Sequence, residues 1–232
     1  MKNLAIIPAR GGSKRIPKKN IKQFFGVPII AYSIKAAKDS GLFDEIMVST
    51  DDTEIAKLAQ SFGAKIPFMR SKINADDIAT VADAVIEVLK YYSSKGEIPK
   101  NICCLFPTAP LIKHSSLIEA YQMLSDEDCD SIVSVQKFSY PIQRAINLND
   151  KGYIEMIYPE FSRTRSQDLP ALYHDAGQFY WAKTHRFIEA KRFMSPRSKM
   201  YVLSELEAHD IDNEEDWQLA EMKYKINLGS EK

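Results

Sequence analysis

Residues 4–20 read LAIIPARGGSKRIPKKN and join a short apolar run to a basic loop that contains two glycines. The run itself, Leu4–Ala9, has the continuous apolar pattern of a strand that is covered on both faces of its sheet. Pro28–Ser40 then has the pattern of a helix that ends at Gly41, and Glu45–Thr50 is a second strand-like run. A strand, a helix and a strand in this order predict a βαβ unit on a parallel sheet.

The same alternation continues along the first half of the chain and predicts an α/β fold with a mainly parallel sheet flanked by helices. Ligands bind at the carboxyl ends of the strands in such sheets, so the loops after Ala9, Thr50 and Phe106 are expected to face one cleft. A last helix is predicted over Asn213–Lys225, with Asn213 as its cap and acidic residues in its first turn. The other predicted elements are helices over Thr53–Phe62, Ile78–Tyr92 and Ser115–Leu124, and strands over Lys65–Met69 and Ile102–Phe106.

From about Gln136 the pattern becomes rich in strands and prolines. A β-rich excursion of this kind within an α/β domain is often an oligomerisation arm or a substrate lid. We therefore predict one domain over residues 1–232 with a β-rich insertion at about 137–180. The strands predicted in this part of the chain are Val133–Phe138, Tyr153–Tyr158 and Gln178–Lys183.

Composition excludes several classes of protein. The 232 residues are 45% hydrophobic, which argues against disorder, and 31 Lys+Arg balance 31 Asp+Glu, which removes a global argument for nucleic acid or an anionic membrane as partner. We find neither a signal-peptide pattern nor a run of about 18–20 apolar residues that would span a membrane. The three cysteines, Cys103, Cys104 and Cys129, fit reduced core thiols, so we expect a cytoplasmic protein.

The basic loop has the densest chemical signal. Gly11 and Gly12 are expected to let the backbone turn sharply and bring N–H groups close to a ligand. The spacing GxxxxGK[ST] of a P-loop is absent, and so is GxGxxG. A solvated basic loop or a nucleic-acid patch would explain the charge but not the glycines at the end of a strand. A nucleoside triphosphate is the polyanion of matching size for the five cations Arg10, Lys14, Arg15, Lys18 and Lys19.

The run IIPARGGSKRIPKKN closely resembles the opening motif of the CMP-sialic acid synthetases, which are cytidylyltransferases that activate nine-carbon sugar acids. The resemblance implies a Rossmann-like nucleotide-sugar transferase fold and attack of the sugar's anomeric hydroxyl on the α-phosphate of CTP, with release of pyrophosphate. Tyr173–Trp181 resembles in particular the branch that uses pseudaminic acid; sialic acid members usually have Asn-Gly-Ala there. Four further stretches agree in order and extend the resemblance along nearly the whole chain: Ser49–Asp52, Pro107–Pro110, Arg165–Pro170 and Asp210–Asp212.

The resemblance assigns roles around CTP. Arg70 and Thr80 are expected near the cytosine and ribose, Arg15 and Lys18 act as peripheral steering charges, and Asp77 is expected to cap a helix rather than contact the ligand. The residues implied in catalysis are Arg10, Lys14, Lys19 and Asp212. The residues implied in binding CTP are Arg10, Gly11, Gly12, Ser13, Lys14, Asn20, Arg70 and Thr80.

Asp210 and Asp212 would hold a divalent metal by the same resemblance. The residues themselves support this, because carboxylates at i and i+2 of a predicted strand project to one face. Acidic oxygen ligands suit Mg²⁺, with Mn²⁺ as the alternative. We assign the acidic residues that follow, Glu214–Asp216, to the helix end.

The sugar site is expected to differ from that of sialic acid members, which commonly have LQPTSP where this chain has LFPTAP at residues 105–110. Phe106 cannot make the amide contact of that Gln, although it could simply pack in the core. Arg163 and Arg165 are candidates for holding the sugar carboxylate, Gln178 for reading sugar hydroxyls or amides, and Asp175 for supporting Gln178.

In relatives the β-rich arm crosses to the partner subunit, so the resemblance implies a homodimer here in which Arg165 would act in trans. The predicted substrates are CTP and pseudaminic acid, with no nucleic-acid or membrane partner. The same reaction on legionaminic or N-acetylneuraminic acid is the alternative, and a non-catalytic nucleotide-binding protein is a third hypothesis.

Overall fold

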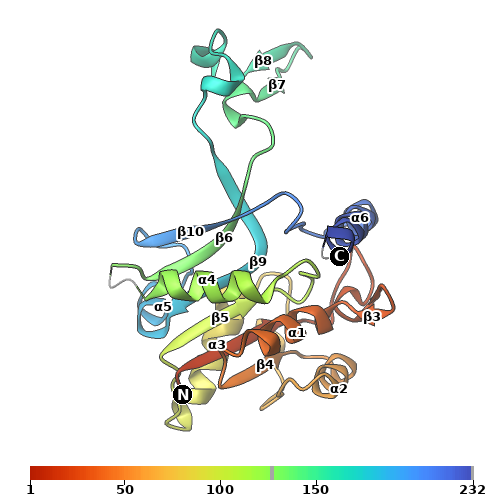
Figure 1. Ribbon diagram of the computed structural model, residues 1–232, viewed down its shortest axis with the longest axis vertical. Coiled ribbons are helices and arrows are strands. Elements are labelled where there is room, and N and C mark those ends of the chain that lie inside the picture. Colours follow the sequence, from red (N-terminus) through yellow and green to blue (C-terminus); the bar gives the residue numbers. More distant parts are fainter. Residues whose placement is uncertain (126–127, 231–232) are drawn as a thin grey trace.

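A six-stranded sheet forms the centre of the computed structural model, which describes residues 1–125 and 128–230 (Figure 1). Its strands lie in the order β10-β6-β9-β5-β1-β4, and neighbours are parallel except at β9, which runs antiparallel to β5 and β6. The prediction of a mainly parallel sheet is therefore confirmed. The strands are β1 Asn3–Pro8, β4 Glu45–Ser49, β5 Asn101–Leu105, β6 Ser131–Lys137, β9 Tyr173–Lys183 and β10 Ser198–Leu203.

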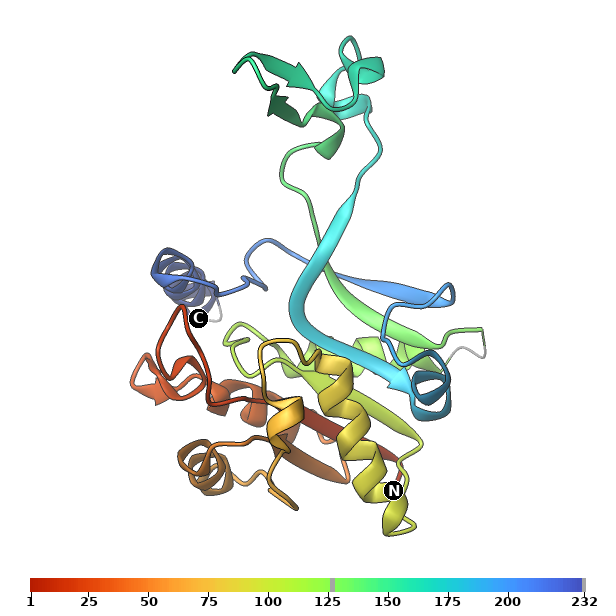
Figure 2. The same cartoon turned by 180° about the vertical axis from the view of Figure 1, so that it is seen from behind.

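Strand β1 explains the continuous apolar run, because helices cover both of its faces. Ala5 and Ile7 are buried in one hydrophobic cluster, whereas Leu4 and Ile6 are buried in a second. The first cluster includes residues of α1, Ile30–Ser40, α2, Thr53–Ser61, and α4, His114–Leu124; the second includes residues of α3, Val81–Ser94, and α5, Thr184–Ala190. Figures 1 and 2 show these two layers from opposite sides.

The C-terminal helix α6, Glu214–Ser230, packs beside the beginning of the chain rather than on the sheet (Figure 1). Phe24 lies at the centre of this contact and meets the rings of Tyr32, Trp217 and Tyr224 edge-on, at centroid distances of 5.4, 5.7 and 5.4 Å. This packing brings the segment before α6 next to the basic loop. A two-stranded hairpin, β2 Gln23–Phe24 and β3 Val27–Pro28, carries Phe24.

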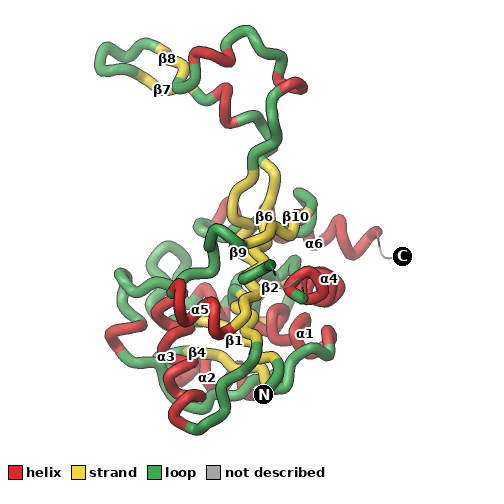
Figure 3. Tube along the Cα trace, turned by 90° about the vertical axis from the view of Figure 1, so that its left-hand side faces the viewer, coloured by secondary structure: helices red, strands yellow, loops and turns green. Residues whose placement is uncertain are grey.

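Residues 138–172 form an arm that stands away from the sheet between β6 and β9 (Figures 1 and 3). Its hairpin exposes large apolar side chains: Ile146 is 58% exposed, Leu148 65% and Ile154 71%. The hairpin strands are β7 Ile146–Leu148 and β8 Ile154–Met156. The chain also has short 3-10 helices at η1 Lys19–Ile21, η2 Lys72–Asn74, η3 Ile142–Arg144, η4 Pro159–Phe161 and η5 Ser166–Asp168.

Several predicted elements differ from the structure. Lys65–Met69 makes only one bridge, between Lys65 and Met47, because Pro67 lacks the N–H that would continue the ladder. Asp210–Asp212 lies in a loop and not on a strand. Pro28 belongs to β3 and not to the helix after it. Strands β2, β3, β7 and β10 and helix α5 were not predicted, and the third predicted helix begins three residues too early.

No helix in the described ranges is both long enough and apolar enough to cross a membrane.

Candidate active site

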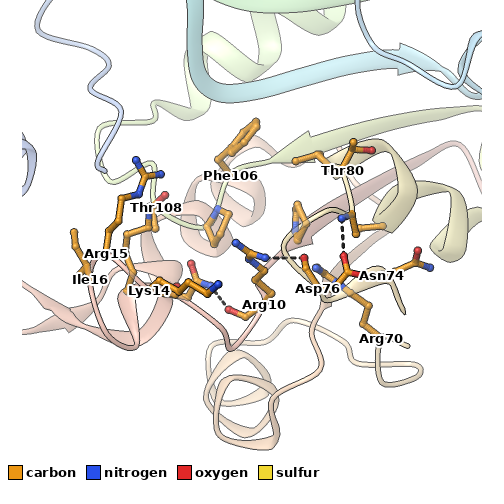
Figure 4. Close-up of a pocket in the computed structure, with 18 residues that line it drawn as sticks. Arg10, Lys14, Arg15, Ile16, Arg70, Asn74, Asp76, Thr80, Phe106 and Thr108 are labelled. Atoms are coloured by element: carbon orange, nitrogen blue, oxygen red, sulfur yellow. Dashed lines mark hydrogen bonds between the residues drawn. The ribbon is translucent and has the colours of Figure 1, made fainter. Parts of the chain in front are cut away.

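A cleft of about 570 Å³ opens at the carboxyl ends of β1 and β5 (Figure 4). The loops that follow β1 and β5 line the cleft, whereas the loop after β4 contacts the loop after β1 beside it: the Ala9 N–H donates to the Ser49 carbonyl at 2.9 Å, and the Gly11 N–H donates to Asp51 Oδ1 at 2.9 Å. The common edge expected from the parallel strands is therefore present. The cleft is lined by these residues of the predicted site: Arg10, Ser13, Lys14, Lys19, Asn20, Arg70, Thr80 and Phe106.

The two glycines of the basic loop have different surroundings. A Cβ added to Gly11 would lie 2.9 Å from Oδ2 of Asp52, so close packing requires glycine there. No atom lies within 4 Å of the corresponding position at Gly12. Neither glycine has a positive φ, but the chain bends at Gly11 and the N–H of Ser13 donates to the Gly11 carbonyl at 3.0 Å, so the sharp turn predicted for them is present. A Lys in the same loop, Lys18, has the left-handed backbone instead, with φ 52°.

Arg10 and Lys14 point into the cleft from the loop after β1 (Figure 4). Nη1 of Arg10 donates to the carbonyl of Asp76 at 2.7 Å and to Oδ1 of Asp77 at 2.9 Å. The ammonium of Lys14 donates to the other oxygen of Asp77. Two cations of the cleft therefore share one carboxylate.

Lys19 and Asn20 fix the loop to the rest of the site. The amide of Asn20 is buried and donates to the Arg10 carbonyl at 2.8 Å. Nζ of Lys19 donates to the carbonyl of Ile211 at 2.6 Å, and burial lowers the pKa of this amine although Asp212 and Asp210 oppose the shift. The contact joins the basic loop to the acidic pair, because Lys19 and Ile211 are 192 positions apart along the chain.

Asp210 and Asp212 lie next to the cationic loop. Nη2 of Arg15 donates to Oδ1 of Asp212 at 2.6 Å, and Nζ of Lys19 lies 4.0 Å from the same oxygen. Arg15 therefore lines the cleft and holds an acidic residue of the site, where the sequence analysis treated it as peripheral. Burial, and then the charge of Asp212, raise the pKa of the Asp210 carboxyl.

A carboxylate whose charged form is disfavoured by burial and by a neighbouring carboxylate fits a divalent cation, which would offset that repulsion. The described residues contain no group of three or more His, Cys, Asp or Glu side chains arranged to hold a metal. The donor set fits Mg²⁺ nevertheless, because this ion usually binds one or two carboxylates together with waters and substrate phosphates.

Arg70 and Thr80 line the cleft but already have partners within the protein. The buried guanidinium of Arg70 donates to Oγ of Ser49 at 2.9 Å and also to its carbonyl, and burial lowers its pKa. Thr80 is the N-cap of α3, where its hydroxyl accepts from the Asp83 N–H at 3.2 Å. The expectation that Asp77 caps this helix is therefore wrong.

The two predicted sugar residues on β9 differ in burial, because Asp175 is exposed and Gln178 is buried. The ring of Phe106 meets the ring of Tyr180 edge-on at 5.2 Å, and the hydroxyl of Tyr180 donates to Asp175. Gln178 is 2% exposed, and its amide donates to the carbonyl of Glu207 at 2.6 Å, so it does not line the cleft.

Arg163 and Arg165 belong to the arm, residues 138–172, and do not line the cleft of their own chain. Nε of Arg165 donates to Oδ2 of Asp168 at 2.7 Å, and its side chain is exposed.

Three polar residues that line the cleft, Asn74, Asp76 and Thr108, were not among the predicted site residues. Thr108 stands in the PTAP stretch quoted above, and Asp76 in a pair of acidic residues before a helix, so both had a signal in the sequence.

Comparison with known proteins supports one family. A family model described as "Cytidylyltransferase" matches residues 4–221. A pseudaminic acid cytidylyltransferase of Campylobacter jejuni subsp. jejuni serotype O:23/36 is 44% identical over 227 residues, which is 98% of each chain. A CMP-N,N'-diacetyllegionaminic acid synthase of Legionella pneumophila is 34% identical over 98% of each chain.

Solved structures share the fold. A CMP:2-keto-3-deoxy-manno-octonic acid synthetase complexed with CTP covers 99% of this chain and 100% of its own, with a TM-score of 0.69 at 17% identity. The family model and the identities together show that the chain belongs to the cytidylyltransferase family.

Proposed function

We propose that the protein couples CTP to pseudaminic acid, giving CMP-pseudaminic acid and pyrophosphate. The observation that carries this proposal is the cleft at the carboxyl edge of the sheet, where the cations of the loop after β1 converge. Its relative of 44% identity is a pseudaminic acid cytidylyltransferase, which supports this sugar over legionaminic or N-acetylneuraminic acid.

Arg10, Lys14 and Lys19 would bind the triphosphate and offset the negative charge that develops as the anomeric hydroxyl attacks the α-phosphate. Catalysis of phosphoryl transfer rests mainly on such positioning and electrostatic stabilisation. The basic loop holds these groups before substrate arrives, because Asn20 and the 2.6 Å bond from Lys19 to the Ile211 carbonyl fix its backbone. Gly11, Gly12 and Ser13 would offer donors to the phosphates, and Arg70 and Thr80 would contact the nucleoside.

Cytidylyltransferases of this kind generally use a divalent metal. In this chain Asp210 and Asp212 would hold it, Mg²⁺ or alternatively Mn²⁺, and when bound it would offset charge on the phosphate oxygens.

For the sugar, we propose that Phe106 sets the shape of the pocket beside Tyr180 and that Asp175 and Gln178 support its wall. Arg163 or Arg165 would hold the sugar carboxylate. Because both lie on the arm and outside the cleft of their own chain, we propose that the protein is one domain whose insertion, about residues 137–180, reaches the cleft of a second copy. The exposed apolar residues of the arm hairpin support such a homodimer.

We also propose that the protein works in the cytoplasm. Its three cysteines are free thiols, and all three are buried.

The test is pyrophosphate release with CTP and Mg²⁺ against pseudaminic, legionaminic and N-acetylneuraminic acids in parallel. We expect turnover with pseudaminic acid to exceed that with the other two. Preference for another acid would support the proposed reaction but overturn pseudaminic acid as the substrate. Binding of CTP without turnover of any of the three would favour a non-catalytic role.

A further inference from the structure

The segment 71–80, here called the cleft loop, contributes Asn74, Asp76 and Thr80 to the wall of the cleft (Figure 4). Both of its ends are fixed to α3. At the start, the N–H of Ser71 and the amide of Asn74 donate to the carboxylate of Glu87 at 2.9 and 2.8 Å. At the end, Thr80 and Asp83 form a capping box. These contacts hold the two ends of the loop, so a ligand in the cleft would move the middle of the loop and not its ends.

The middle of the cleft loop is held by the basic loop. Asp77 accepts from Nη1 of Arg10 at 2.9 Å and from Nζ of Lys14, and the carbonyl of Asp76 accepts from Arg10 at 2.7 Å. The carboxylate of Asp76 takes no part in this, since it accepts the N–H groups of Ile78 and Ala79 at 2.9 and 2.7 Å. Lys14 and then Arg10 lower the pKa of Asp77, so its carboxylate is charged at neutral pH.

These contacts occupy the two cations that the proposed function assigns to the triphosphate. A carboxylate and a phosphate compete for the same guanidinium and ammonium donors. Ion pairs exposed to solvent are weak, so a ligand with several phosphate charges has the advantage. Little packing opposes displacement of the loop, because the next side chain, Ile78, is 89% exposed.

We propose that Asp77 is an internal stand-in for the triphosphate: it pairs with Arg10 and Lys14 while the cleft is empty, and CTP displaces it and releases the middle of the cleft loop. The inference rests on the proposed function, because it assumes that Arg10 and Lys14 bind CTP. The apparent affinity for CTP is then reduced by the fraction of molecules in which Asp77 occupies the two cations.

The test compares three variants by calorimetric titration with CTP and with inorganic tripolyphosphate. Asp77→Asn removes the competing charge and is expected to bind both ligands about two- to tenfold more tightly than the wild type. Asp77→Glu keeps a carboxylate and is expected to bind like the wild type. Glu54→Gln is the matched control, because it removes a carboxylate that pairs with Lys18 of the same basic loop but not with Arg10 or Lys14.

Turnover adds a readout that a purely structural role would not move. In Asp77→Asn the KM for CTP is expected to fall by the same factor as the dissociation constant, with the KM for the sugar acid unchanged. Hydrogen exchange measures whether the middle of the cleft loop is released. Tripolyphosphate is expected to speed exchange of the Ile78 and Ala79 amides in the wild type.

The outcomes separate the two proposals. Suppose that the wild type binds and uses CTP but that Asp77→Asn binds CTP equally tightly or more weakly. Asp77 would then position the two cations, and the proposal that it competes with the triphosphate would be wrong. If Glu54→Gln gained as much affinity for CTP as Asp77→Asn, the gain would come from the change in net charge alone, and this too would overturn the proposal. If the wild type binds tripolyphosphate but not CTP, the proposed function fails while the competition at Asp77 is still measured.

Discussion

Single residues of the basic loop are constrained by their neighbours to very different degrees. Gly11 lies against Asp52, the residue that caps α2 by accepting the N–H groups of Glu54 and Ile55 at 2.7 and 3.1 Å. Gly12 faces open space. The pair therefore offers one substitution at two adjacent positions with opposite structural consequences.

We predict that Gly11→Ala lowers the free energy of unfolding by about 1–3 kcal/mol, because the added Cβ forces Asp52 or the backbone to move. Gly12→Ala is the matched control, and its effect on stability is expected to stay within about 0.5 kcal/mol. Urea unfolding of both variants without ligand measures the difference. Equal stabilities would show that the loop shifts freely and that Gly11 is not needed for packing.

At the scale of elements, the N-cap of α3 belongs both to the helix and to the wall of the cleft. Thr80 and Asp83 satisfy each other's backbone N–H groups, at 3.2 Å for the Asp83 N–H and 2.9 Å for the Thr80 N–H. Since Thr80 also lines the cleft, a nucleotide that used its hydroxyl would compete with the cap.

We predict that Thr80→Ala destabilises the protein by about 1 kcal/mol, whereas Thr80→Ser, which keeps the hydroxyl, stays close to the wild type. Chemical unfolding without nucleotide measures both. A loss as large in Thr80→Ser would assign the effect to the methyl group and not to the cap.

The same cap predicts a dependence on pH. Hydrogen bonds from Thr80 lower the pKa of Asp83 below its ordinary value of 3.8. A depressed carboxyl pKa stabilises the fold above the unfolded value, and this stabilisation is lost as pH falls through the folded value. The stability difference between wild type and Asp83→Asn is therefore expected to be constant from pH 7 to 5 and to shrink below about pH 4. A difference that grows on acidification would contradict the assignment.

At the scale of the whole molecule, Arg165 lies on the arm and does not line the cleft of its own chain. In the proposed homodimer, each cleft would combine Asp212 from one copy with Arg165 from the other. Arg165→Ala and Asp212→Ala should each be nearly inactive, the first through a raised KM for the sugar acid and the second through loss of the metal.

Mixing the two inactive variants tests this arrangement. After subunit exchange, a mixed pair contains one cleft with both residues intact, so about one quarter of the wild-type activity should return. No recovery, with mixed pairs demonstrated by native mass spectrometry, would show that Arg165 acts within its own chain or not at all.

Replacing exposed Leu148 and Ile154 by Asp is expected to give a monomer in sedimentation experiments.

Much of the sheet was predictable, because β1 and β5 are apolar from their second residue onward. Residues such as Ile6, Cys103 and Cys104 are fully buried, so neighbouring positions face different helices and none needs to be polar. Strand β10 lacks this signal: it lies at the edge of the sheet, and Met200 and Val202 remain about half exposed.

The cleft was predictable as a place, but its internal contacts were not. Asp77 and Arg10 are 67 positions apart, and no local pattern links them. Asp210–Asp212 was predicted as a strand because of its alternation, yet the side chain of Lys19 takes the Ile211 carbonyl that a neighbouring strand would have used. Contacts of this range depend on the finished fold and not on sequence spacing.

The position of β9 has a consequence for how the chain is made. The neighbours of β6 in the sheet are β9 and β10, and both are synthesised after it. When β6 leaves the ribosome, it has two unpaired edges, and the apolar arm follows before β9 can join. At translation rates of about 5–20 residues per second, this interval lasts seconds, during which exposed strand edges favour association with other chains. The growing chain is therefore most exposed to association with other chains after β6 has emerged and before β9 has paired with it.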